Sequence, residues 1–262
     1  MTKAQSIRAF EIIGDIALVA IPKSYKSQGE QAAHRISLRQ KNIKAIYEKI
    51  GGHEGKLRIQ KLKHLYGEKR TVTIHRENQI ALKLDVAKTY FSPRQSTERK
   101  RVYEQIKKPE VILVMFSGIG PFTISIAKNT PAKAVYGVEL NKTAHKYAVE
   151  NAKLNKVDEK TVMFCGDVRK IVPKLNKKFD RIIMPLPKGA ESFLNVAFAA
   201  AKKGAIIHFY DFEKEEDIPE KAIEKVKKAA AAAKKKTRVL CVVKCGQLAP
   251  RAFRVCVDFK VL

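Results

Sequence analysis

Two glycines and two acidic residues stand where a nucleotide-like cofactor could bind. A buried apolar run, residues 111–116, leads into Gly118 and Gly120, and an apolar helical pattern follows them. A strand, a turn without side chains and a helix let a ligand approach the backbone near the positive end of the helix. The next two strands end in Glu139 and Asp167, and a carboxylate at Glu139 could accept hydrogen bonds from both hydroxyls of a ribose. This order of strand ends predicts a site for an adenosine-containing cofactor.

Each of these features alone has a plainer explanation. A glycine pair is often a tight connection between a strand and a helix, and an acid after a strand often caps a helix or is solvated. Their succession at consecutive strand ends favours the cofactor site over the separate explanations.

A second set of residues could contact a substrate. Arg94 and Glu98 are four positions apart, so they share one face of a helix if that helix starts early, and an ordinary surface ion pair is the alternative. Further along, the strand at 181–186 ends in Pro-Leu-Pro at residues 185–187. Rigid loops at the carboxyl ends of α/β strands commonly hold a substrate.

The charge of the chain points to a polyanionic partner. Its 262 residues include 53 Lys and Arg against 26 Asp and Glu, a net charge of +27. Repulsion among so many positive charges does not stabilise a fold, and proteins with such an excess usually bind nucleic acid. A general lysine bias is the alternative, but lysine enrichment in heat-adapted proteins comes with glutamate. No basic stretch carries the large apolar anchors of a membrane-surface helix.

Neither export nor metal binding is indicated. The sequence has no apolar run long enough to cross a membrane, and its N-terminus lacks the pattern of a signal peptide. The cysteines are Cys165, Cys241, Cys245 and Cys256. Their spacing fits neither a disulfide framework nor a zinc finger. We therefore expect a cytoplasmic protein without a metal, in which all of these thiols are buried.

The first third of the sequence predicts a small α+β module, residues 1–88. It would contain a hairpin at 10–22, a helix at 29–49 and strands within 56–66 and 70–86. A turn at Glu77-Asn78 would divide the last of these segments.

Residues 89–262 predict a doubly wound α/β domain, because helices and buried strands alternate. The expected elements lie at 95–106, 111–116, 120–128, 133–139, 142–154, 161–165, 181–186, 189–202, 204–210, 218–234, 238–244 and 252–261. The last two are strands with a short link, which we expect to pair antiparallel at one edge of the sheet.

Several motifs together are similar to one family. They are Tyr90-Phe91-Ser92-Pro93-Arg94-x-x-x-Glu98-Arg99, His75-Arg76-Glu77-Asn78, Phe116-Ser117-Gly118-Ile119-Gly120-Pro121-Phe122, Met184-x-Leu186-Pro187-Lys188 and Leu248-Ala249-Pro250-Arg251. From about residue 10 onward the chain resembles the archaeal and eukaryotic tRNA (guanine-37-N1)-methyltransferases, and especially an archaeal branch that is bifunctional in wyosine biosynthesis. The resemblance implies a class I S-adenosylmethionine-dependent methyltransferase domain after a small RNA-positioning module, with guanosine 37 beside the anticodon as its target.

The resemblance also implies a role for particular residues. Glu98 would be the general base that takes the N1 proton of guanine, and Arg58 would bond the guanine O6. The residues implied to contact S-adenosylmethionine are Tyr90, Phe116, Gly118, Gly120, Glu139, Asp167 and Leu186. Among them, Glu139 would hold the ribose and Asp167 the adenine amine. The residues implied to bind or position the tRNA are Arg94, Arg99, Pro185 and Pro187.

The implied chemistry is consistent with these residue types. Guanine N1 carries a proton and is a poor nucleophile until a carboxylate removes it. An arginine at O6 would stabilise the resulting anion, and the methyl group could then transfer in line without a metal. The target base must leave the stack to reach a pocket, which favours the anticodon loop of a tRNA over a duplex. We expect the chain to bind it as a monomer.

Three departures from the family pattern bear on the substrate. Relatives commonly have a longer N-terminal region with an extra tRNA-gripping domain. They often have an aspartate where this chain reads Val114-Met115-Phe116, and an asparagine where it has Pro185. A proline makes the pocket more apolar, and bifunctional relatives also methylate C7 of 4-demethylwyosine. The sequence therefore suggests this second activity as a hypothesis.

The sequence also allows other functions. The aminocarboxypropyl transferase of wyosine synthesis uses the same cofactor, but Glu98 and the loop at 184–188 argue against it. A basic RNA-binding protein without activity is a second alternative, which the intact acids and Arg58 disfavour. A dinucleotide-dependent dehydrogenase is disfavoured because Pro121 and Phe122 follow the glycine pair, where a third glycine would be expected.

Overall fold

The computed structural model describes residues 10–55 and 57–262, with only the backbone at 23–25 and 53–54. The expectation that the chain begins without a signal peptide falls mainly on residues 1–9, which lie outside the described residues.

The chain forms two compact units. The first ends at Pro93 and the second runs from Arg94 to Leu262, so the division falls a few residues after the expected one at Lys88.

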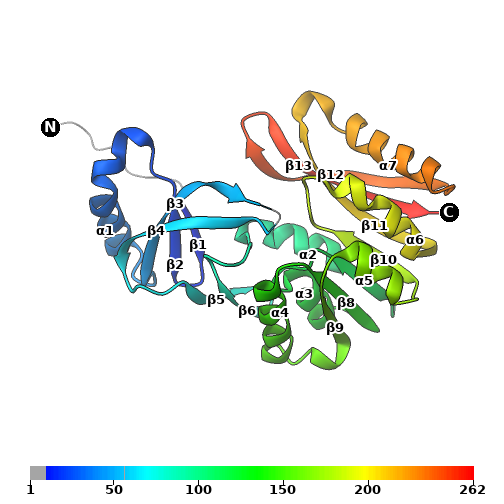
Figure 1. The fold of residues 1–262 in the computed structure, drawn as a ribbon, viewed down its shortest axis with the longest axis horizontal. Coiled ribbons are helices and arrows are strands. Elements are labelled where there is room, and N and C mark those ends of the chain that lie inside the picture. Colours follow the sequence, from blue (N-terminus) through cyan, green and yellow to red (C-terminus); the bar gives the residue numbers. More distant parts are fainter. Residues whose placement is uncertain (1–9, 56) are drawn as a thin grey trace. The chain divides into compact units, whose positions relative to one another are not determined.

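The first unit contains a four-stranded sheet with the order β1-β2-β3-β4 (Figure 1). The strands are β1 (Phe10–Ile13), β2 (Ile16–Val19), β3 (Ala45–Glu54) and β4 (Ile59–Gly67). β1 and β2 pair antiparallel, so the predicted hairpin is confirmed. Helix α1 (Gly29–Arg39) packs on the sheet, where Ala33 and Ile36 join an apolar core with Ile46.

The helix predicted over residues 29–49 is wrong in its second half. α1 ends at Arg39, residues 41–42 form a turn, and Ala45 begins β3, which pairs in parallel with β2. Ala45, Ile46 and Tyr47 are all buried. A short apolar run that is buried on both faces has the same periodicity in a strand as in a helix, so the pattern alone could not separate the two.

A two-stranded ribbon completes the first unit. It consists of β5 (Val72–Glu77) and β6 (Ile80–Asp85), which pair antiparallel. Asn78 and Gln79 at its tip both have positive φ angles, 44° and 62°, as a tight hairpin turn requires. The predicted strands are confirmed, but the turn lies one residue later than the predicted Glu77-Asn78, because Glu77 still pairs with Ile80.

The second unit is a doubly wound α/β domain, as predicted. Its seven-stranded sheet has the order β12-β13-β11-β10-β7-β8-β9. The strands are β7 (Val111–Met115), β8 (Ala134–Glu139), β9 (Thr161–Cys165), β10 (Phe179–Met184), β11 (Ala201–Lys214), β12 (Thr237–Ala249) and β13 (Ala252–Val261). The pairs among β9, β8, β7, β10 and β11 are parallel. β12 and β13 pair antiparallel at one edge, as expected.

Helices cover both faces of this sheet (Figure 1). On one face lie α2 (Ser96–Glu104), α3 (Pro121–Asn129) and α4 (Lys142–Leu154). On the other lie α5 (Val168–Lys174), α6 (Leu194–Ala200) and α7 (Glu220–Ala232). The main apolar core lies under this second group and includes Leu113, Ile182, Phe209 and Val257. These side chains come from neighbouring strands and point to the same face, as strand alternation requires.

Helix α5 was not predicted from the sequence. It has seven residues and contains Pro173, so its pattern is too short and too interrupted to indicate a helix. The helix predicted at 189–202 is shorter than expected, because it starts with a 3₁₀ turn, Ala190–Phe193, and ends at Ala200.

The expectation that all the cysteines are buried is wrong for two of them. Cys165 and Cys241 are exposed, Cys245 is half-buried and Cys256 is buried, and each is a free thiol. Cys165 ends β9 and Cys241 lies in β12, which are the two edge strands of the sheet. An edge strand has a neighbour on one side only, so its side chains are less covered than those of a central strand.

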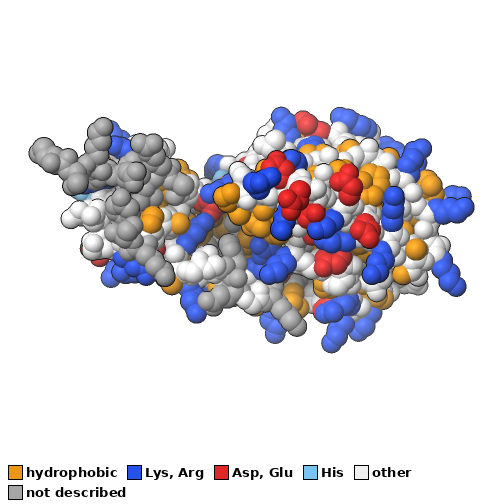
Figure 2. All heavy atoms as spheres, turned by 90° about the horizontal axis from the view of Figure 1, so that it is seen from above, with side chains coloured by type: hydrophobic (Ala, Val, Ile, Leu, Met, Phe, Trp, Pro, Cys, Tyr) orange, Lys and Arg blue, Asp and Glu red, His pale blue; other side chains and the backbone are white. Residues whose placement is uncertain are grey.

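Basic side chains are spread over the surface of the second unit. Figure 2 shows Lys and Arg over the visible face with acidic side chains among them. Some of them form ion pairs, such as Lys202 with Asp180 and Lys221 with Asp217, both at 2.7 Å. The basic side chains on this face do not form one continuous patch. Their charge would attract a polyanion in a general way. No helix within the described ranges is long and apolar enough to span a bilayer.

Candidate active site

The glycine turn after β7 has the backbone geometry that the sequence predicts. Phe116, Gly118 and Gly120 have φ angles of 60°, 57° and 90°. A β-carbon at Gly120 would lie 2.8 Å from Cδ1 of Ile124, so a larger residue there would have a strained backbone and would have to displace the Ile124 side chain. The N–H of Ser117 donates to the carbonyl of Val138 at 2.9 Å, which fixes the turn to the end of β8.

Glu139 lies at the end of β8 and faces this turn. Its two carboxylate oxygens accept hydrogen bonds from the N–H groups of Gly118 and Asn141, each at 2.7 Å. Burial raises the pKa of Glu139, and these two N–H donors act in the opposite direction. A carboxylate oxygen has two lone pairs, so each oxygen can accept one further hydrogen bond. The two hydroxyl groups of a ribose could donate to these two remaining acceptor positions.

Asp167 occupies the end of the next strand, β9, but its carboxylate already has partners. It caps α5 by accepting from the N–H of Arg169 at 2.9 Å, and the guanidinium of Arg169 contacts it at 2.6 Å. Arg169 holds the pKa of Asp167 below its usual range. The helix-capping explanation of this acid therefore applies in the structure. A contact with an adenine amine would require the guanidinium to move.

An aromatic pair beside this acid was not identified from the sequence. The rings of Phe116 and Phe193 lie 4.9 Å apart and meet edge to face, and the guanidinium of Arg169 lies 5.0 Å from the ring centre of Phe193. Phe193 ends the 3₁₀ turn that follows the proline loop. Its position shortly after the end of β10 is the sequence feature that could have indicated a role at the site.

The proline loop follows β10, next to β7 at the centre of the sheet. The N–H of Leu186 donates to the carbonyl of Met184 at 2.8 Å, which makes a three-residue turn. Pro185 and Leu186 are half-buried and Pro187 is buried. The connections from β7 lead to one side of the sheet and those from β10 to the other, so these loops flank the switch point at which doubly wound folds bind ligands.

Glu98 is a buried carboxylate in α2, with 4% of its surface exposed. Both of its oxygens accept from the guanidinium of Arg101, each at 2.7 Å. The hydroxyl of Tyr210 donates to Oε1 at 2.5 Å. Neither Arg101 nor Tyr210 was singled out from the sequence, although Arg101 lies three positions after Glu98 and therefore on the same helix face.

The two arginines predicted to contact RNA differ in exposure. Arg94 is exposed and lies in a 3₁₀ turn, Pro93–Gln95, just before α2 starts, so the shared helix face expected for Arg94 and Glu98 does not arise from a regular helix. Arg99 is 2% exposed. A side chain that is covered in this way is better suited to holding the surrounding chain in place than to meeting a phosphate.

The first unit brings Arg58 and Tyr90 together. The guanidinium carbon of Arg58 lies 4.3 Å from the centre of the Tyr90 ring, a cation–π contact. Arg58 has a positive φ of 54°, which is unusual for a residue with a side chain. Strained backbone of this kind often occurs at functional positions.

The fold and these residues define a Rossmann-like α/β domain of the methyltransferase class, with a small N-terminal domain. Residues 73–240 match the TRM5/TYW2 methyltransferase domain, and residues 2–71 match the TYW2 N-terminal domain. The chain belongs to the TRM5/TYW2 methyltransferase family, whose members use S-adenosylmethionine and modify tRNA. The expected fold, the cofactor and the membership of this family are confirmed, whereas the expected special similarity to the bifunctional branch is not: Taw22 is 35% identical and Trm5b 43%.

Three of the relatives differ in the activity that their names give. The tRNA (guanine(37)-N(1))-methyltransferase Trm5b of Pyrococcus abyssi is 43% identical over 97% of this chain and 74% of its own length. A tRNA(Phe) (4-demethylwyosine(37)-C(7)) aminocarboxypropyltransferase of Methanocaldococcus jannaschii is 36% identical over 96% of this chain and 97% of its own. The tRNA (guanine(37)-N(1))/4-demethylwyosine(37)-methyltransferase Taw22 of Nanoarchaeum equitans is 35% identical over 82% of this chain and 88% of its own length.

Solved structures agree with the sequence match. The crystal structure of Trm5b from Pyrococcus abyssi aligns with a TM-score of 0.89 and 42% identity, over 97% of this chain and 75% of that one. A complex of aTrm5 with tRNALeu aligns with a TM-score of 0.87 and 31% identity, over 97% of this chain and 72% of that one.

Proposed function

We propose that this chain transfers a methyl group from S-adenosylmethionine to N1 of guanosine 37 in tRNA. The observation that carries the proposal is the 43% identity with Trm5b, which extends over 97% of the chain and so includes both units. The buried and firmly held carboxylate of Glu98 is a suitable general base for this reaction.

Glu98 takes the N1 proton in this proposal. Guanine N1 becomes a nucleophile when that proton leaves, and negative charge then develops on O6. Arg58 donates to O6 and stabilises this charge. S-adenosylmethionine supplies an electrophilic methyl group when it is bound. The reaction requires the protein to remove one proton, to hold the base in line and to exclude water.

The cofactor is held at the carboxyl ends of β7, β8 and β10. The turn containing Gly118 and Gly120 allows the amino-acid part to approach the backbone, and Glu139 accepts from the ribose hydroxyls. Asp167 contacts the adenine amine after Arg169 has moved away. Three apolar or aromatic residues complete the assigned set, namely Tyr90, Phe116 and Leu186.

The tRNA is bound through its anticodon loop. A guanine in a loop leaves its stack at a smaller energetic cost than a base in a duplex. We assign the first unit to positioning the RNA, Arg94 to a phosphate contact and Arg99 to holding the segment that carries Glu98. Pro185 and Pro187 form the rigid wall of the substrate loop. Affinity should fall steeply with salt, because phosphate contacts release counterions.

Mass spectrometry of nucleosides tests the proposal. A tRNA with unmodified guanosine 37 is incubated with the chain and S-adenosylmethionine, and 1-methylguanosine is expected at position 37. Glu98→Gln should slow the reaction by roughly 10²- to 10⁴-fold, as loss of a general base does. Glu104→Gln is the matched control, because Glu104 is an exposed acid on the same helix. Absence of 1-methylguanosine with the unaltered chain would overturn the proposal.

Aminocarboxypropyl transfer to 4-demethylwyosine is a second candidate. The relative with that activity matches 96% of this chain and 97% of its own length, and residues 2–71 match the TYW2 N-terminal domain. The same experiment with tRNA that contains 4-demethylwyosine separates the candidates, because a methyl group and an aminocarboxypropyl group give products of different mass.

Methylation of 4-demethylwyosine at C7 is the finer form of the main proposal. It is supported by Pro185 in the substrate loop and by the 35% identity with Taw22. A chain that methylates guanosine 37 and leaves 4-demethylwyosine unmodified would be monofunctional, and Pro185 would then have no role in choosing the substrate.

A further inference from the structure

A row of polar side chains is buried on the sheet face beneath α2. His208 and Tyr210 of β11 point to this face, and Asp258 and Cys256 of β13 lie opposite them in the antiparallel register. Each of these four side chains is no more than 1% exposed. The alternate residues of the same strands, such as Phe209 and Val257, point to the other face and join the apolar core. A buried polar row is costly unless its groups are paired, so its hydrogen bonds are informative.

Arg101 connects this row to Glu98. Its guanidinium donates to both oxygens of Glu98 at 2.7 Å and to both oxygens of Asp258 at 2.6 and 3.3 Å. The amide of Gln105, at the end of the same helix, donates to Asp258 at 3.1 Å. One planar guanidinium therefore fixes two carboxylates relative to each other. The planar fork of arginine is suited to this geometry, and a lysine ammonium is not.

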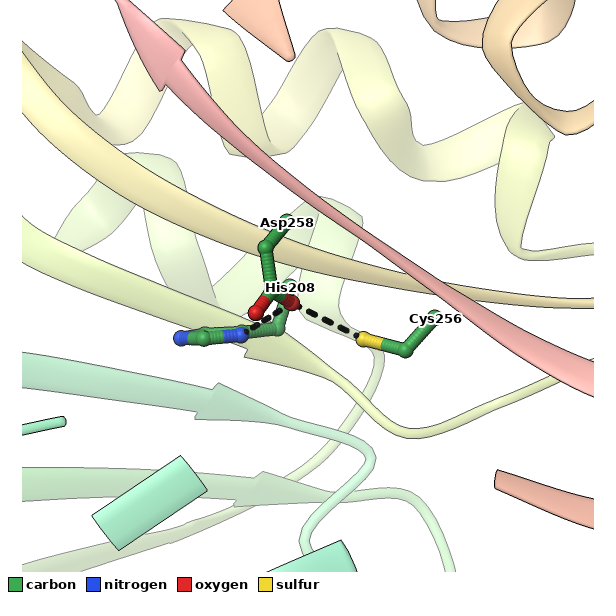
Figure 3. Close-up of side chains that lie close together, drawn as sticks. All are labelled: His208, Cys256 and Asp258. Carbon is green, nitrogen blue, oxygen red and sulfur yellow. Dashed lines mark hydrogen bonds and ion pairs between the residues drawn. The ribbon is translucent and has the colours of Figure 1, made fainter. Parts of the chain in front are cut away.

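The proton of His208 can be placed from its partners. Arg181 contacts Nε2 of His208 at 2.8 Å, and an arginine can only donate, so Nε2 must be the acceptor. Nδ1 therefore carries the hydrogen and donates it to Asp258 at 2.6 Å (Figure 3). Burial lowers the pKa of His208, which agrees with a neutral ring. Arg181 in turn pairs with Glu110 at 2.8 Å.

The same cluster has the residue types of a metal site, but its bonding argues against one. The ligand atoms of His208, Cys256 and Asp258 lie within 4.8 Å of one another. A metal would need Nδ1 without its hydrogen and Cys256 as a thiolate, whereas burial raises the pKa of Cys256 and its thiol donates to Asp258 at 3.1 Å. Arg101 and Arg181 would also repel the cation. The cluster is a hydrogen-bond network.

We propose that Arg101, Asp258 and His208 are positioning residues that hold the Glu98 carboxylate in the orientation in which it accepts the guanine N1 proton. The inference rests on the proposed function, in which Glu98 is the general base. Buried ion pairs are often no more stabilising than apolar residues of the same size, so stability alone does not account for this network. Fixing a general base does account for it, since a displacement of about 1 Å can slow a reaction about 100-fold.

The charge balance of the network is consistent with this role. It contains three carboxylates, on Glu98, Glu110 and Asp258, and two guanidinium groups, on Arg101 and Arg181. With His208 neutral, the network carries one excess negative charge. Uptake of one proton by Glu98 makes it neutral, which is the change that a general base undergoes during the reaction.

Two variants and one matched control test the proposal under saturating tRNA and S-adenosylmethionine. Asp258→Asn removes the negative charge and one of the two acceptor oxygens that Arg101 and His208 contact. Arg101→Lys keeps the charge but removes the planar fork. Both should lower the single-turnover methylation rate by about 10- to 100-fold, while Kd for the tRNA and for the cofactor stays within about threefold. Asp211→Asn is the control, because Asp211 of β11 is also a buried and paired acid but lies on the opposite face of the sheet.

The outcomes separate the two proposals. If the unaltered chain forms no 1-methylguanosine, the proposed function fails and the positioning role fails with it. If the unaltered chain is active and Arg101→Lys or Asp258→Asn retains its full rate, only the positioning role is overturned. An equal loss of rate in the Asp211→Asn control would also overturn it, since the effect would then follow from general destabilisation. If Asp258→Asn does not fold, Arg101→Lys decides, because it keeps the side-chain charge and most of its volume.

Discussion

Tyr210 of β11 donates its hydroxyl hydrogen to Oε1 of Glu98 in α2, at an oxygen–oxygen distance of 2.5 Å. Burial holds the pKa of Tyr210 well above its usual value, so the phenol stays protonated and acts as a donor at neutral pH. Oε1 accepts from both Tyr210 and Arg101, whereas Oε2 accepts from Arg101 alone among the described side chains. Oε2 is therefore the oxygen with an acceptor position left for the guanine N1 proton.

Replacement of Tyr210 by phenylalanine tests this difference between the oxygens. The variant removes one hydrogen bond to a charged group, which should lower the free energy of unfolding by about 1.5–3 kcal/mol. Oε1 would then also have an open acceptor position, and we expect methyl transfer to slow by about tenfold. Single-turnover assays and urea unfolding measure the two effects. A variant with the stability loss but an unchanged rate would show that Tyr210 supports the fold and not the orientation of Glu98.

Local patterns were enough to predict much of the second unit. Helix α4 and strand β9 begin and end at the predicted residues, and Glu139 lies at the strand end where a ribose acceptor was expected. The Glu98 network could not be predicted in this way. Arg101 and Asp258 are 157 positions apart, and periodicity carries no information about which side chains meet across a sheet. Helix α5 was not predicted because its local pattern is too short to indicate a helix.

A methyl group at Gly120 should disturb the cofactor turn. Gly120→Ala places a β-carbon 2.8 Å from Cδ1 of Ile124 at a φ of 90°, so both strain and overlap oppose it. We expect a loss of about 3 kcal/mol in the free energy of unfolding and at least tenfold weaker binding of S-adenosylmethionine. Calorimetric titration and thermal unfolding measure these quantities.

Gly189 offers the matched control for that variant. It also has a positive φ, 82°, but a β-carbon there would meet no atom of the described chain within 4 Å. Gly189→Ala should therefore cost about 1 kcal/mol and leave cofactor affinity nearly unchanged. Equal effects of the two variants would mean that backbone strain, and not the tight packing at Gly120, determines cofactor binding.

Arg169 should compete with the cofactor for Asp167. Its guanidinium contacts the carboxylate at 2.6 Å and lies on the surface, where solvent screens the ion pair. Arg169→Ala would free Asp167 for the adenine amine and should tighten binding of S-adenosylmethionine by up to about fivefold. Asp167→Asn should weaken it. If Arg169→Ala also weakens binding, Arg169 contributes to the cofactor site, for example by stacking with Phe193, and does not compete for it.

Asp211 gives the stability of the second unit a distinctive pH dependence. Burial raises its pKa from 3.8 to about 6, although Lys225 is its ion-pair partner. The folded state therefore keeps a proton on Asp211 between about pH 4 and pH 6, where the unfolded chain has lost it. This contribution to stability is complete below pH 4 and is lost as the pH rises through 6. Because the ion pair with Lys225 offsets part of the effect of burial, we expect a change of only about 1 kcal/mol.

Asp211→Asn removes this titration and leaves Lys225 paired with Glu213 at 2.7 Å. Urea unfolding of both chains at pH 4, 5, 6 and 7 measures the difference between them. The free energy of unfolding of the variant should rise relative to that of the unaltered chain as the pH increases from 4 to 7. A difference that stays constant, or that changes in the opposite direction, would mean that Lys225 keeps Asp211 ionised throughout this range. In that case burial would not be the dominant influence on the carboxylate.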